Sequence, residues 1–354
     1  MSATAGTARI ARLAAGLEEP LLVLDPTNVR YLVGFRSSNP ALLVRPDGHA
    51  TLYSDFRYAE AGQAAAVAAE VEFVVSGRAL LKDLAARLTG RIGFEAGFVT
   101  YDGWEALGTG GAELVPRRGN VQALRAVKDE AEVDAIRRAC AITTATYERI
   151  AEEGLVGRTE RDVAARIEQL FRELGADGAA FASIVAAGAN GALPHADPGD
   201  RPIAAGTLVT IDCGAQVAGY CADCTRTFAT GPLSDELARA YVVCLAAEEA
   251  GLAAICPGGV GAAVHEAAHA VIRAAGWGEQ FGHGLGHGVG LAVHEAPALR
   301  PESEDVLAAG NVVSCEPGIY LPGSGGVRIE DLVVVRDGAP EILTLFPKAL
   351  LTVG

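Results

Sequence analysis

The first third of the chain alternates short apolar segments with amphipathic ones. A hairpin is predicted over residues 41–53, with its turn at Pro46-Asp47-Gly48, and Asp55 can cap a helix that follows it. An amphipathic stretch near residues 78–89 separates two of the remaining strands. Short apolar runs predict those strands at residues 21–24, 71–75 and 91–95. This alternation predicts an α/β domain.

A change in the pattern near residues 117–130 indicates a domain boundary. After a polar break, a charged helical pattern begins at Val127, and its apolar positions recur along one helix face. Further helices are predicted at about residues 159–174, 234–250 and 260–275, and β-rich segments at residues 207–213, 217–228, 311–316 and 327–335. Because strands and helices do not alternate strictly here, the pattern predicts an α+β domain. We therefore expect two domains, at residues 1–120 and 121–354.

Composition and charge limit the classes of partner. Half of the 354 residues are hydrophobic, which is enough for a large core. The 29 Lys and Arg against 44 Asp and Glu give a net charge of −15, which disfavours nucleic acid and anionic membrane surfaces. No uncharged apolar run reaches the ~18 residues that span a bilayer, and the N-terminal stretch lacks a secretory apolar region. The seven cysteines, an odd number, favour a reducing cytoplasm over a disulfide framework.

Two aspartates lie at the ends of apolar segments in the second domain. Asp212 ends the run LVTI, and Asp223 follows in the predicted return strand of a hairpin that turns near Gly219. Acids among apolar strands are costly unless a cation neutralises them. Considered alone, the pair is more typical of a turn residue and a surface acid on an edge strand.

Histidine is concentrated in one region, because six of the seven histidines lie between residues 195 and 294. Three of them, His283, His287 and His294, lie in the glycine-rich segment FGHGLGHGVGLAVHE. Glycine lets the backbone approach a ligand closely, and neutral imidazole is the commonest nitrogen ligand of metals. This spacing is hard to reconcile with a merely flexible loop, so we expect the chemistry in the second domain.

Two glutamates complete the candidate set. Glu316 follows an apolar strand in VVSCEPGIY, and Glu330 shares one strand face with Arg328 in GGVRIEDLVVV. Each glutamate alone would more often be a surface residue or half of a core ion pair. Four carboxylates and one imidazole together suit two divalent ions, Mn²⁺ or Co²⁺ before Zn²⁺. The full series is Asp212, Asp223, His287, Glu316 and Glu330.

In its motifs, the chain resembles the creatinase/prolidase branch of the pita-bread metallopeptidases, which includes Xaa-Pro dipeptidase and aminopeptidase P. NVRYLVGF (28–35) and SDFRYAE (54–60) are similar to parts of the small N-terminal domain of this branch. The motifs that resemble its catalytic domain occur in the family's order: LPHADPGDRPI, IDCGAQVAGYCADCTRTF, HGLGHGVGLAVHEAP, EPGIY and GGVRIED. The resemblance implies an α/β N-terminal domain, an α+β pita-bread C-terminal catalytic domain and a homodimer.

The resemblance also implies how the series would bind metal. Asp212 would ligate one ion, His287 and Glu316 the other, and Asp223 and Glu330 would bridge both. A hydroxide held between the two ions would attack the scissile carbonyl, and Glu316 would accept its proton. Mn²⁺ is the metal that we expect first, with Co²⁺ or Zn²⁺ as alternatives.

Four further residues match substrate-binding positions of the family: His195, His283, His294 and Arg328. His195 and His294 would contact the scissile carbonyl and the developing gem-diolate, so they would be catalytic together with Glu316. His283 would line the substrate site, and Arg328 would hydrogen-bond from behind the metal ligands.

Specificity and cysteine chemistry stay open. Prolidases often place an arginine shortly after the His-Glu motif to bind the carboxylate of the product, whereas the nearest arginine here, Arg300 in HEAPALRP, lies further along. Preference for dipeptides is therefore open. Cys213 and Cys315 flank ligand positions, and we interpret them as small core residues, with sensitivity to oxidation as the alternative.

Two other motifs offer different metal chemistry. HEAAH (265–269) fits the zinc-protease signature H-E-x-x-H, but so short a pattern often arises by chance, and we interpret it as a solvated helix face. CADC (221–224) could be half of a zinc site or a redox pair, but no second C-x-x-C exists. We expect both motifs to lie outside the catalytic machinery.

The sequence therefore predicts a cytoplasmic metallopeptidase that cleaves the Xaa–Pro bond of dipeptides, a prolidase. Removal of Xaa from longer Xaa-Pro peptides, as by aminopeptidase P, is the nearest alternative. A metal-free hydrolase like creatinase would lack the ligand series, and a non-catalytic binding protein on the same fold would carry broken ligands or basic patches. The complete series and the net charge of −15 disfavour both.

Overall fold

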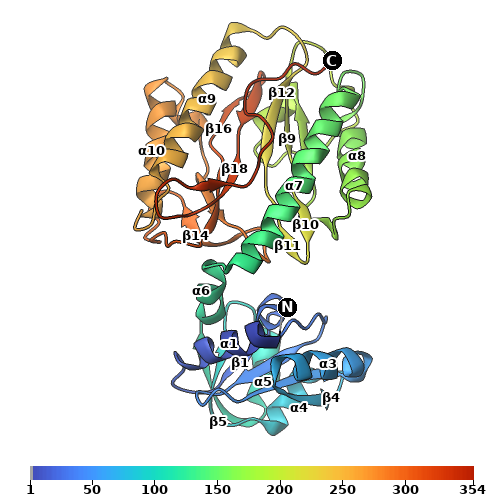
Figure 1. Cartoon of the computed structure of the whole chain (residues 1–354), viewed down its shortest axis with the longest axis vertical. Coiled ribbons are helices and arrows are strands. Elements are labelled where there is room, and N and C mark those ends of the chain that lie inside the picture. Colours follow the sequence, from blue (N-terminus) through green and yellow to red (C-terminus); the bar gives the residue numbers. More distant parts are fainter. Residues whose placement is uncertain (1–2) are drawn as a thin grey trace. The chain divides into compact units, whose positions relative to one another are not determined.

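The computed structural model describes residues 3–354, and the chain divides into two compact units. The first unit ends at Arg125, and the second runs from Ala126 to Gly354 (Figure 1). Helix α6 (Asn120–Ala126) contains this division. The boundary expected after residue 120 therefore falls at the start of this helix.

The first unit is a mixed sheet with helices, which confirms the predicted α/β class. The strand order is β4-β3-β2-β1-β5-β6, with antiparallel pairing among β1, β2 and β3 and parallel pairing elsewhere. The strands are β1 (Leu21–Val23), β2 (Ala41–Val44), β3 (Ala50–Asp55), β4 (Glu72–Ser76), β5 (Thr89–Glu95) and β6 (Gly111–Arg117). The helices are α1 (Ala3–Ala14), α2 (Pro26–Val33), α3 (Ala59–Ala69), α4 (Leu80–Arg87) and α5 (Tyr101–Gly108).

Local signals explain where these elements join. Strands β2 and β3 form the predicted hairpin, and Gly48 takes a φ of 87° in its turn, which only glycine adopts easily. The side chain of Asp55 caps the 3₁₀ turn η1 (Phe56–Tyr58) by accepting a hydrogen bond from the backbone N–H of Arg57. Asp25 caps α2 in the same way, and Pro26 fits the first turn because it has no N–H to satisfy.

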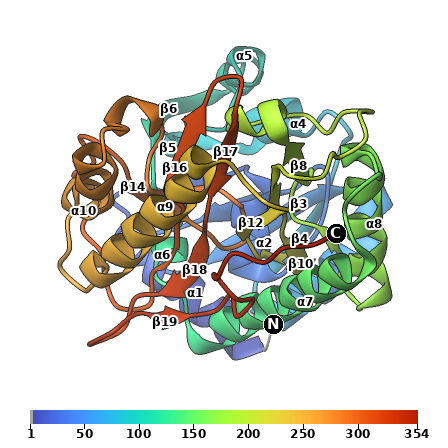
Figure 2. The same ribbon diagram turned by 90° about the horizontal axis from the view of Figure 1, so that it is seen from above.

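The second unit is α+β, as predicted, and has the pita-bread fold. Its strands form the sheets β12-β9-β8, β11-β10-β7, β14-β13-β15-β18-β19 and β16-β17. Figures 1 and 2 show α9 alongside α10, and α7 alongside α8. The helices are α7 (Glu130–Glu153), α8 (Glu160–Glu173), α9 (Asp235–Ala254) and α10 (Gly261–Ala274), with 3₁₀ turns η2 (Gly188–Ala192) and η3 (Gly278–Gln280). The strands are β7 (Gly178–Ala179), β8 (Ile184–Ala187), β9 (Leu208–Asp212), β10 (Ala215–Val217), β11 (Tyr220–Cys221), β12 (Thr225–Ala229), β13 (Gly286–Gly288), β14 (Glu295–Leu299), β15 (Val312–Cys315), β16 (Gly318–Leu321), β17 (Gly325–Arg328), β18 (Asp331–Val334) and β19 (Glu341–Ile342).

Two segments that the sequence predicted as continuous strands are interrupted, and this corrects the prediction. Asp223 lies in a break between β11 and β12, and Glu330 lies in a break between β17 and β18. The backbone N–H of Glu330 donates to the carbonyl oxygen of Thr225, the first residue of β12, at 3.1 Å, and Sγ of Cys224 lies 3.6 Å from the carbonyl oxygen of Glu330, so the two breaks lie side by side. Outside a regular ladder, a side chain is freed from strict alternation between the two faces. Both acids can therefore turn toward one point.

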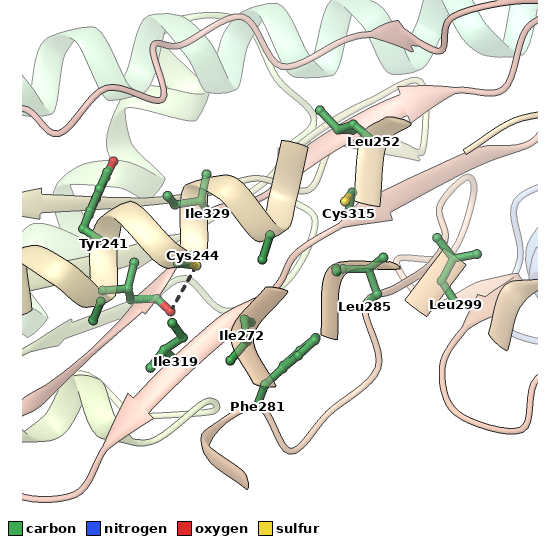
Figure 3. Close-up of a cluster of buried hydrophobic side chains, with 14 of the residues drawn as sticks. Tyr241, Cys244, Leu252, Ile272, Phe281, Leu285, Leu299, Cys315, Ile319 and Ile329 are labelled. Atoms are coloured by element: carbon green, nitrogen blue, oxygen red, sulfur yellow. Dashed lines mark hydrogen bonds between the residues drawn. The ribbon is translucent and has the colours of Figure 1, made fainter. Parts of the chain in front are cut away.

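A large hydrophobic core lies where α9 and α10 pack against the strands (Figure 3). Tyr241 and Cys244 of α9 and Ile272 of α10 contribute to this core. Phe281 and Leu285, from the segment before β13, are buried in the same cluster. Burial of these side chains anchors the segment that carries two of the candidate histidines.

Candidate metal and substrate site

Three carboxylates from different segments meet where the two strand breaks join. Asp212 ends β9, opposite Thr225 in the ladder with β12, whereas Asp223 and Glu330 come from the breaks. One oxygen atom of each carboxylate lies within 4.8 Å of the others, and all three residues are buried. Such a group of convergent oxygen atoms suits ligation of a cation.

His287 and Glu316 lie beside these three carboxylates. Nδ1 of His287 lies 3.1 Å from the carbonyl oxygen of Gly288, so the ring can donate a proton there, and this contact turns Nε2 toward the carboxylates. Nε2 lies 3.2 Å from Oε1 of Glu316 and 3.8 Å from Oδ2 of Asp223. The structure therefore brings together all five residues of the predicted series.

Burial and mutual repulsion raise the pKa values of the clustered acids. The pKa values of Asp223 and Glu330 lie well above the usual range, first because of burial and then because of neighbouring carboxylates. Burial also raises the pKa of Asp212, although the Arg328 guanidinium, 2.8 Å from Oδ2, opposes the shift. Glu316 differs: burial raises its pKa, but the hydrogen bond and charge of His287 outweigh burial, and the pKa falls to about 2.

Two of these oxygen atoms lack a partner among the described residues. Oδ1 of Asp212 and Oε1 of Glu330 are buried and accept no hydrogen bond. The other oxygen of Glu330 accepts a hydrogen bond from Thr225 Oγ1 at 2.8 Å. Buried acceptors are nearly always satisfied, so these two oxygen atoms point to a site that a cation would fit. The donor set, four carboxylates and one imidazole, fits a divalent metal ion.

Arg328 holds the back of the site through its guanidinium, which is almost fully buried. It donates to Thr225 Oγ1 and to Tyr320 Oη, both at 3.0 Å. Tyr320 donates in turn to Nε2 of His283 at 2.9 Å, because Nδ1 of His283 donates to the carbonyl oxygen of Gly284 at 2.8 Å. This series of hydrogen bonds fixes both the orientation and the tautomer of His283.

A cavity of about 620 Å³ borders the ligand residues. His195, His283, His294 and Arg328, the predicted substrate-binding residues, all line it. The ring of His294 lies 4.2 Å from that of His287, measured between centroids. The cavity also has an apolar wall, formed by Phe181, Ile184 and Val293, and a further cationic residue, Arg300. It therefore combines a polar centre with surface for an apolar substrate group.

Two residues that position the site, Tyr320 and Glu160, are not among the predicted site residues. Tyr320 lies in the quoted motif EPGIY, so its proximity to Glu316 in the chain was the available signal. Glu160 is the first residue of α8, where an acid is common for helix stability alone. No pattern in the sequence separates that ordinary role from the one that the structure shows.

The Glu160 carboxylate holds both ends of the segment that carries His195. One oxygen accepts the backbone N–H of Ala187 at 2.7 Å. The other accepts Nδ2 of Asn190 at 2.8 Å and the backbone N–H of Gly199 at 2.7 Å. Glu160 is buried, so these three donors depend on it. Residues 187–199 are thereby closed into a loop at the edge of the cavity.

Replacing Glu160 by glutamine is expected to lower the free energy of unfolding by about 1–3 kcal/mol, because an amide N–H₂ then faces N–H donors that lose their acceptor. Urea unfolding measures this change. Glu168→Gln, on the same helix but half-exposed, is the control and should change stability by less than about 0.5 kcal/mol. Equal stability of the two variants would contradict the role of Glu160.

The structure corrects the interpretation of HEAAH. His265 is 5% exposed and not solvated, because Phe281 packs over this face of α10 with its ring 5.4 Å from that of His265. His269 is less buried, and its Nε2 lies 3.2 Å from the carbonyl oxygen of Gly278. The helical pattern alone could not reveal this, because the covering residue comes from the segment that follows the helix.

The cysteines near the ligands are buried. Cys213 and Cys315 are fully buried, and burial raises the pKa of both thiols, as expected of small core residues. Cys221 and Cys224 of CADC are also buried free thiols, and Sγ of Cys224 lies 3.6 Å from the carbonyl oxygen of Glu330. Cys213, Cys224 and Cys315 each adjoin a residue of the candidate series in the chain, and all three are buried.

Fold and site together define a two-domain metallopeptidase. Residues 134–337 match metallopeptidase family M24, and residues 9–127 match the creatinase/prolidase N-terminal domain. The chain belongs to metallopeptidase family M24.

Similar proteins include both dipeptidases and aminopeptidases. The uncharacterized peptidase YqhT of Bacillus subtilis is 38% identical over 337 residues, covering 94% of this chain and 95% of that protein. The solved structure of an Xaa-Pro dipeptidase from Bacillus anthracis has a TM-score of 0.94 at 34% identity, covering 98% of this chain and 100% of that chain. That of an X-Pro aminopeptidase from Thermotoga maritima has a TM-score of 0.82 at 33% identity, covering 95% of this chain and 97% of that chain.

Within residues 3–354, no helix combines the length and the apolar character needed to cross a bilayer.

Proposed function

We propose that the chain is a metal-dependent Xaa-Pro dipeptidase, a prolidase, that hydrolyses the Xaa–Pro bond of dipeptides. The observation that carries the choice of dipeptides is the position of Arg300, whose side chain lines the same cavity as Asp223 and His294. A guanidinium is the side chain best suited to bind a carboxylate, and a dipeptide presents its C-terminal carboxylate one residue from the scissile bond.

The direction of Arg300 follows from the strand before it. Ala298 and Arg300 both line the cavity, whereas Leu299 between them is fully buried in the core. This alternation extends β14 by one residue and turns Arg300 to the substrate side. In the sequence, Arg300 lies further from the His-Glu motif than in many prolidases, but in the structure it still borders the cavity.

The ligand series would hold two divalent ions, Mn²⁺ by first choice and Co²⁺ or Zn²⁺ as alternatives. The fit rests on the two unpartnered oxygen atoms and on the excess of carboxylates over guanidinium at the site. When bound, such ions supply Lewis acidity toward the scissile carbonyl and toward a water molecule. The residues concerned are Asp212, Asp223, His287, Glu316 and Glu330.

The remaining chemistry falls to residues that line the cavity. Glu316 is held in its ionised form by the hydrogen bond and charge of His287, which lower its pKa, and its carboxylate can accept a proton from the attacking water. His294 is neutral there, because burial and then the charge of His287 lower its pKa, so its ring N–H can donate to the carbonyl oxygen as negative charge develops. His195, exposed at the cavity edge, would donate to the same oxygen.

The amide of an Xaa–Pro bond is tertiary and has no N–H that a protein backbone could recognise. The substrate must then be held by its ends and by the proline ring. The apolar wall of Phe181, Ile184 and Val293 offers surface for the ring, and His283, fixed by Tyr320, can orient the peptide from the polar side.

A paired assay tests the function. The purified protein is given an Xaa-Pro dipeptide and an Xaa-Pro-Yaa tripeptide, and bound metal is counted in the same sample. We expect a higher kcat/KM for the dipeptide. Preference for the tripeptide would establish the aminopeptidase P alternative, and metal binding without hydrolysis of either peptide would indicate a binding protein.

Replacing Arg300 by alanine is expected to raise KM for an Xaa-Pro dipeptide roughly 10–100-fold, since a hydrogen bond to a charged group contributes about 1.5–3 kcal/mol. The change in kcat should be small, because Arg300 is not among the residues assigned to the chemical step. The control substrate is the C-terminally amidated dipeptide, whose hydrolysis should hardly respond to the substitution. An unchanged KM for the free acid would exclude Arg300 as the carboxylate anchor.

We also propose that the protein forms a homodimer, as the motif resemblance implies. Sedimentation equilibrium of the full chain tests this, with twice the mass of 36.4 kDa as the expected result. A mass that stays at that of one chain would contradict it.

A further inference from the structure

The residue that links the histidine-rich segment to the rest of the second unit is Leu285. Its backbone N–H donates to Nδ1 of His265 at 3.1 Å, and its carbonyl oxygen accepts the backbone N–H of Glu316 at 2.7 Å. Leu285 lies midway between His283 and His287 in the chain. The backbone of Leu285 therefore connects His265 of helix α10 to Glu316, a candidate metal ligand. The same segment carries His287, a second candidate ligand, two residues later.

His265 itself is held firmly. Its ring stacks on that of His269 at 5.6 Å and lies 5.4 Å from that of Phe281, which in turn contacts the ring of His283 edge-on at 5.0 Å. Burial lowers the pKa of His265 to about 4, so the ring is neutral at neutral pH and Nδ1 can serve as an acceptor. The side chains of Phe281 and Leu285 are embedded in the core around α10 (Figure 3).

The segment has little room to move on its other side. A methyl group at Gly286 would lie 2.0 Å from the carbonyl oxygen of Ser314, so the two backbones are already in close contact. The backbone N–H of His287 donates to Oγ of Ser314 at 3.1 Å, and that hydroxyl donates to Oε1 of Glu316 at 3.0 Å. A shift of the segment at Leu285 would therefore be transmitted to both His287 and Glu316.

We propose that His265 is a positioning residue for the metal site: by accepting the backbone N–H of Leu285, it sets the placement of His287 and Glu316 relative to each other. This inference rests on the proposed role of both residues as ligands. It gives HEAAH a function that needs no metal at the motif itself, in contrast to its zinc-protease interpretation. It also explains why a polar ring is buried at a position where the helix faces the core.

The experiment compares substitutions that keep or remove the acceptor at the position of Nδ1. His265→Asn keeps a carbonyl oxygen near that position, whereas His265→Gln places it further out, and His265→Leu removes it at similar volume. Mn²⁺ affinity is measured by competition titration, and hydrogen exchange of the Leu285 amide is followed in metal-free protein. Ile272→Ala, on the same helix and in the same core, is the control for general destabilisation.

We expect His265→Gln and His265→Leu to weaken Mn²⁺ binding roughly 10–100-fold and to speed exchange at Leu285 by roughly 10-fold or more. His265→Asn should stay close to the original protein, and Ile272→Ala should lose stability but keep its metal affinity. If His265→Leu does not fold, the pair of Asn and Gln variants still carries the comparison.

The proposal is overturned if metal affinity is the same with and without the acceptor, or if Ile272→Ala weakens it as much. Neither the Mn²⁺ titration nor the hydrogen-exchange measurement requires a substrate. Loss of affinity in the Gln variant with no peptide hydrolysis by the original protein would sustain the positioning role and refute the proposed function.

Discussion

Replacing Asp223 by asparagine is expected to lower kcat/KM by a factor on the order of 10³ or more and to reduce the metal content of the purified protein. The Asp223 carboxylate lies within 4.8 Å of those of Asp212 and Glu330, so its charge is central to any cation bound there. Asparagine keeps the shape but removes the charge. Peptidase rates and elemental analysis of the same sample measure both effects.

The same substitution has a second expected consequence. Burial and then Glu330 hold the pKa of Asp223 well above its usual value of 3.8, so the folded metal-free protein binds this proton more tightly than the unfolded chain does. Its contribution to stability therefore declines as pH rises above that value. Metal-free Asp223→Asn should accordingly resist urea better than the metal-free original at pH 7.

Asp200→Asn provides the matched control, because Asp200 is 79% exposed and pairs only at the surface with Arg161. It should leave rate, metal content and stability nearly unchanged. Full turnover with full metal content in Asp223→Asn would refute the ligand role of Asp223.

His294→Ala is expected to reduce kcat by a factor on the order of 10²–10³, which is the usual effect of removing one donor to a developing oxyanion. The metal content should stay the same, because His294 is not one of the five candidate metal ligands. Steady-state kinetics and elemental analysis separate these two effects. His49→Ala, which changes the one histidine of the first unit, is the control.

A His294 variant that loses metal together with activity would show that the residue acts as a ligand. An unchanged kcat would show that it does not donate in the rate-limiting step. Either result would require a different assignment of the cavity histidines.

Motifs predicted the members of the site better than periodicity predicted their geometry. Asp212 was recognisable because it ends a clear apolar strand, and the structure places it at the end of β9. Asp223 and Glu330 were expected within regular strands, because the apolar pattern continues through both breaks. Long-range backbone hydrogen bonds, such as the one from Glu330 to Thr225, lie at these breaks, and a periodic pattern contains no information about such bonds.

Residues that act through tertiary contacts were the hardest to predict. HEAAH was interpreted from the helix alone, and its burial depends on Phe281 from the following segment. Glu160 has the position of an ordinary first-turn acid, but its partners are 27, 30 and 39 residues away. In the first unit, the alternation predicted the class, and the helix expected after Asp55 is present as α3 (Ala59–Ala69), although its alanine-rich sequence has little amphipathic contrast.

The two unpartnered carboxylate oxygens also affect how much folded protein a cell retains. A ligand that binds only the folded state raises the free energy of unfolding as its concentration rises above Kd. With scarce metal, the repulsion at Asp212 and Glu330 is not offset, a larger fraction of chains opens, and proteases degrade that fraction. Metal starvation would then lower the amount of the enzyme as well as its activity, so its abundance would follow the concentration of available divalent metal in the cell.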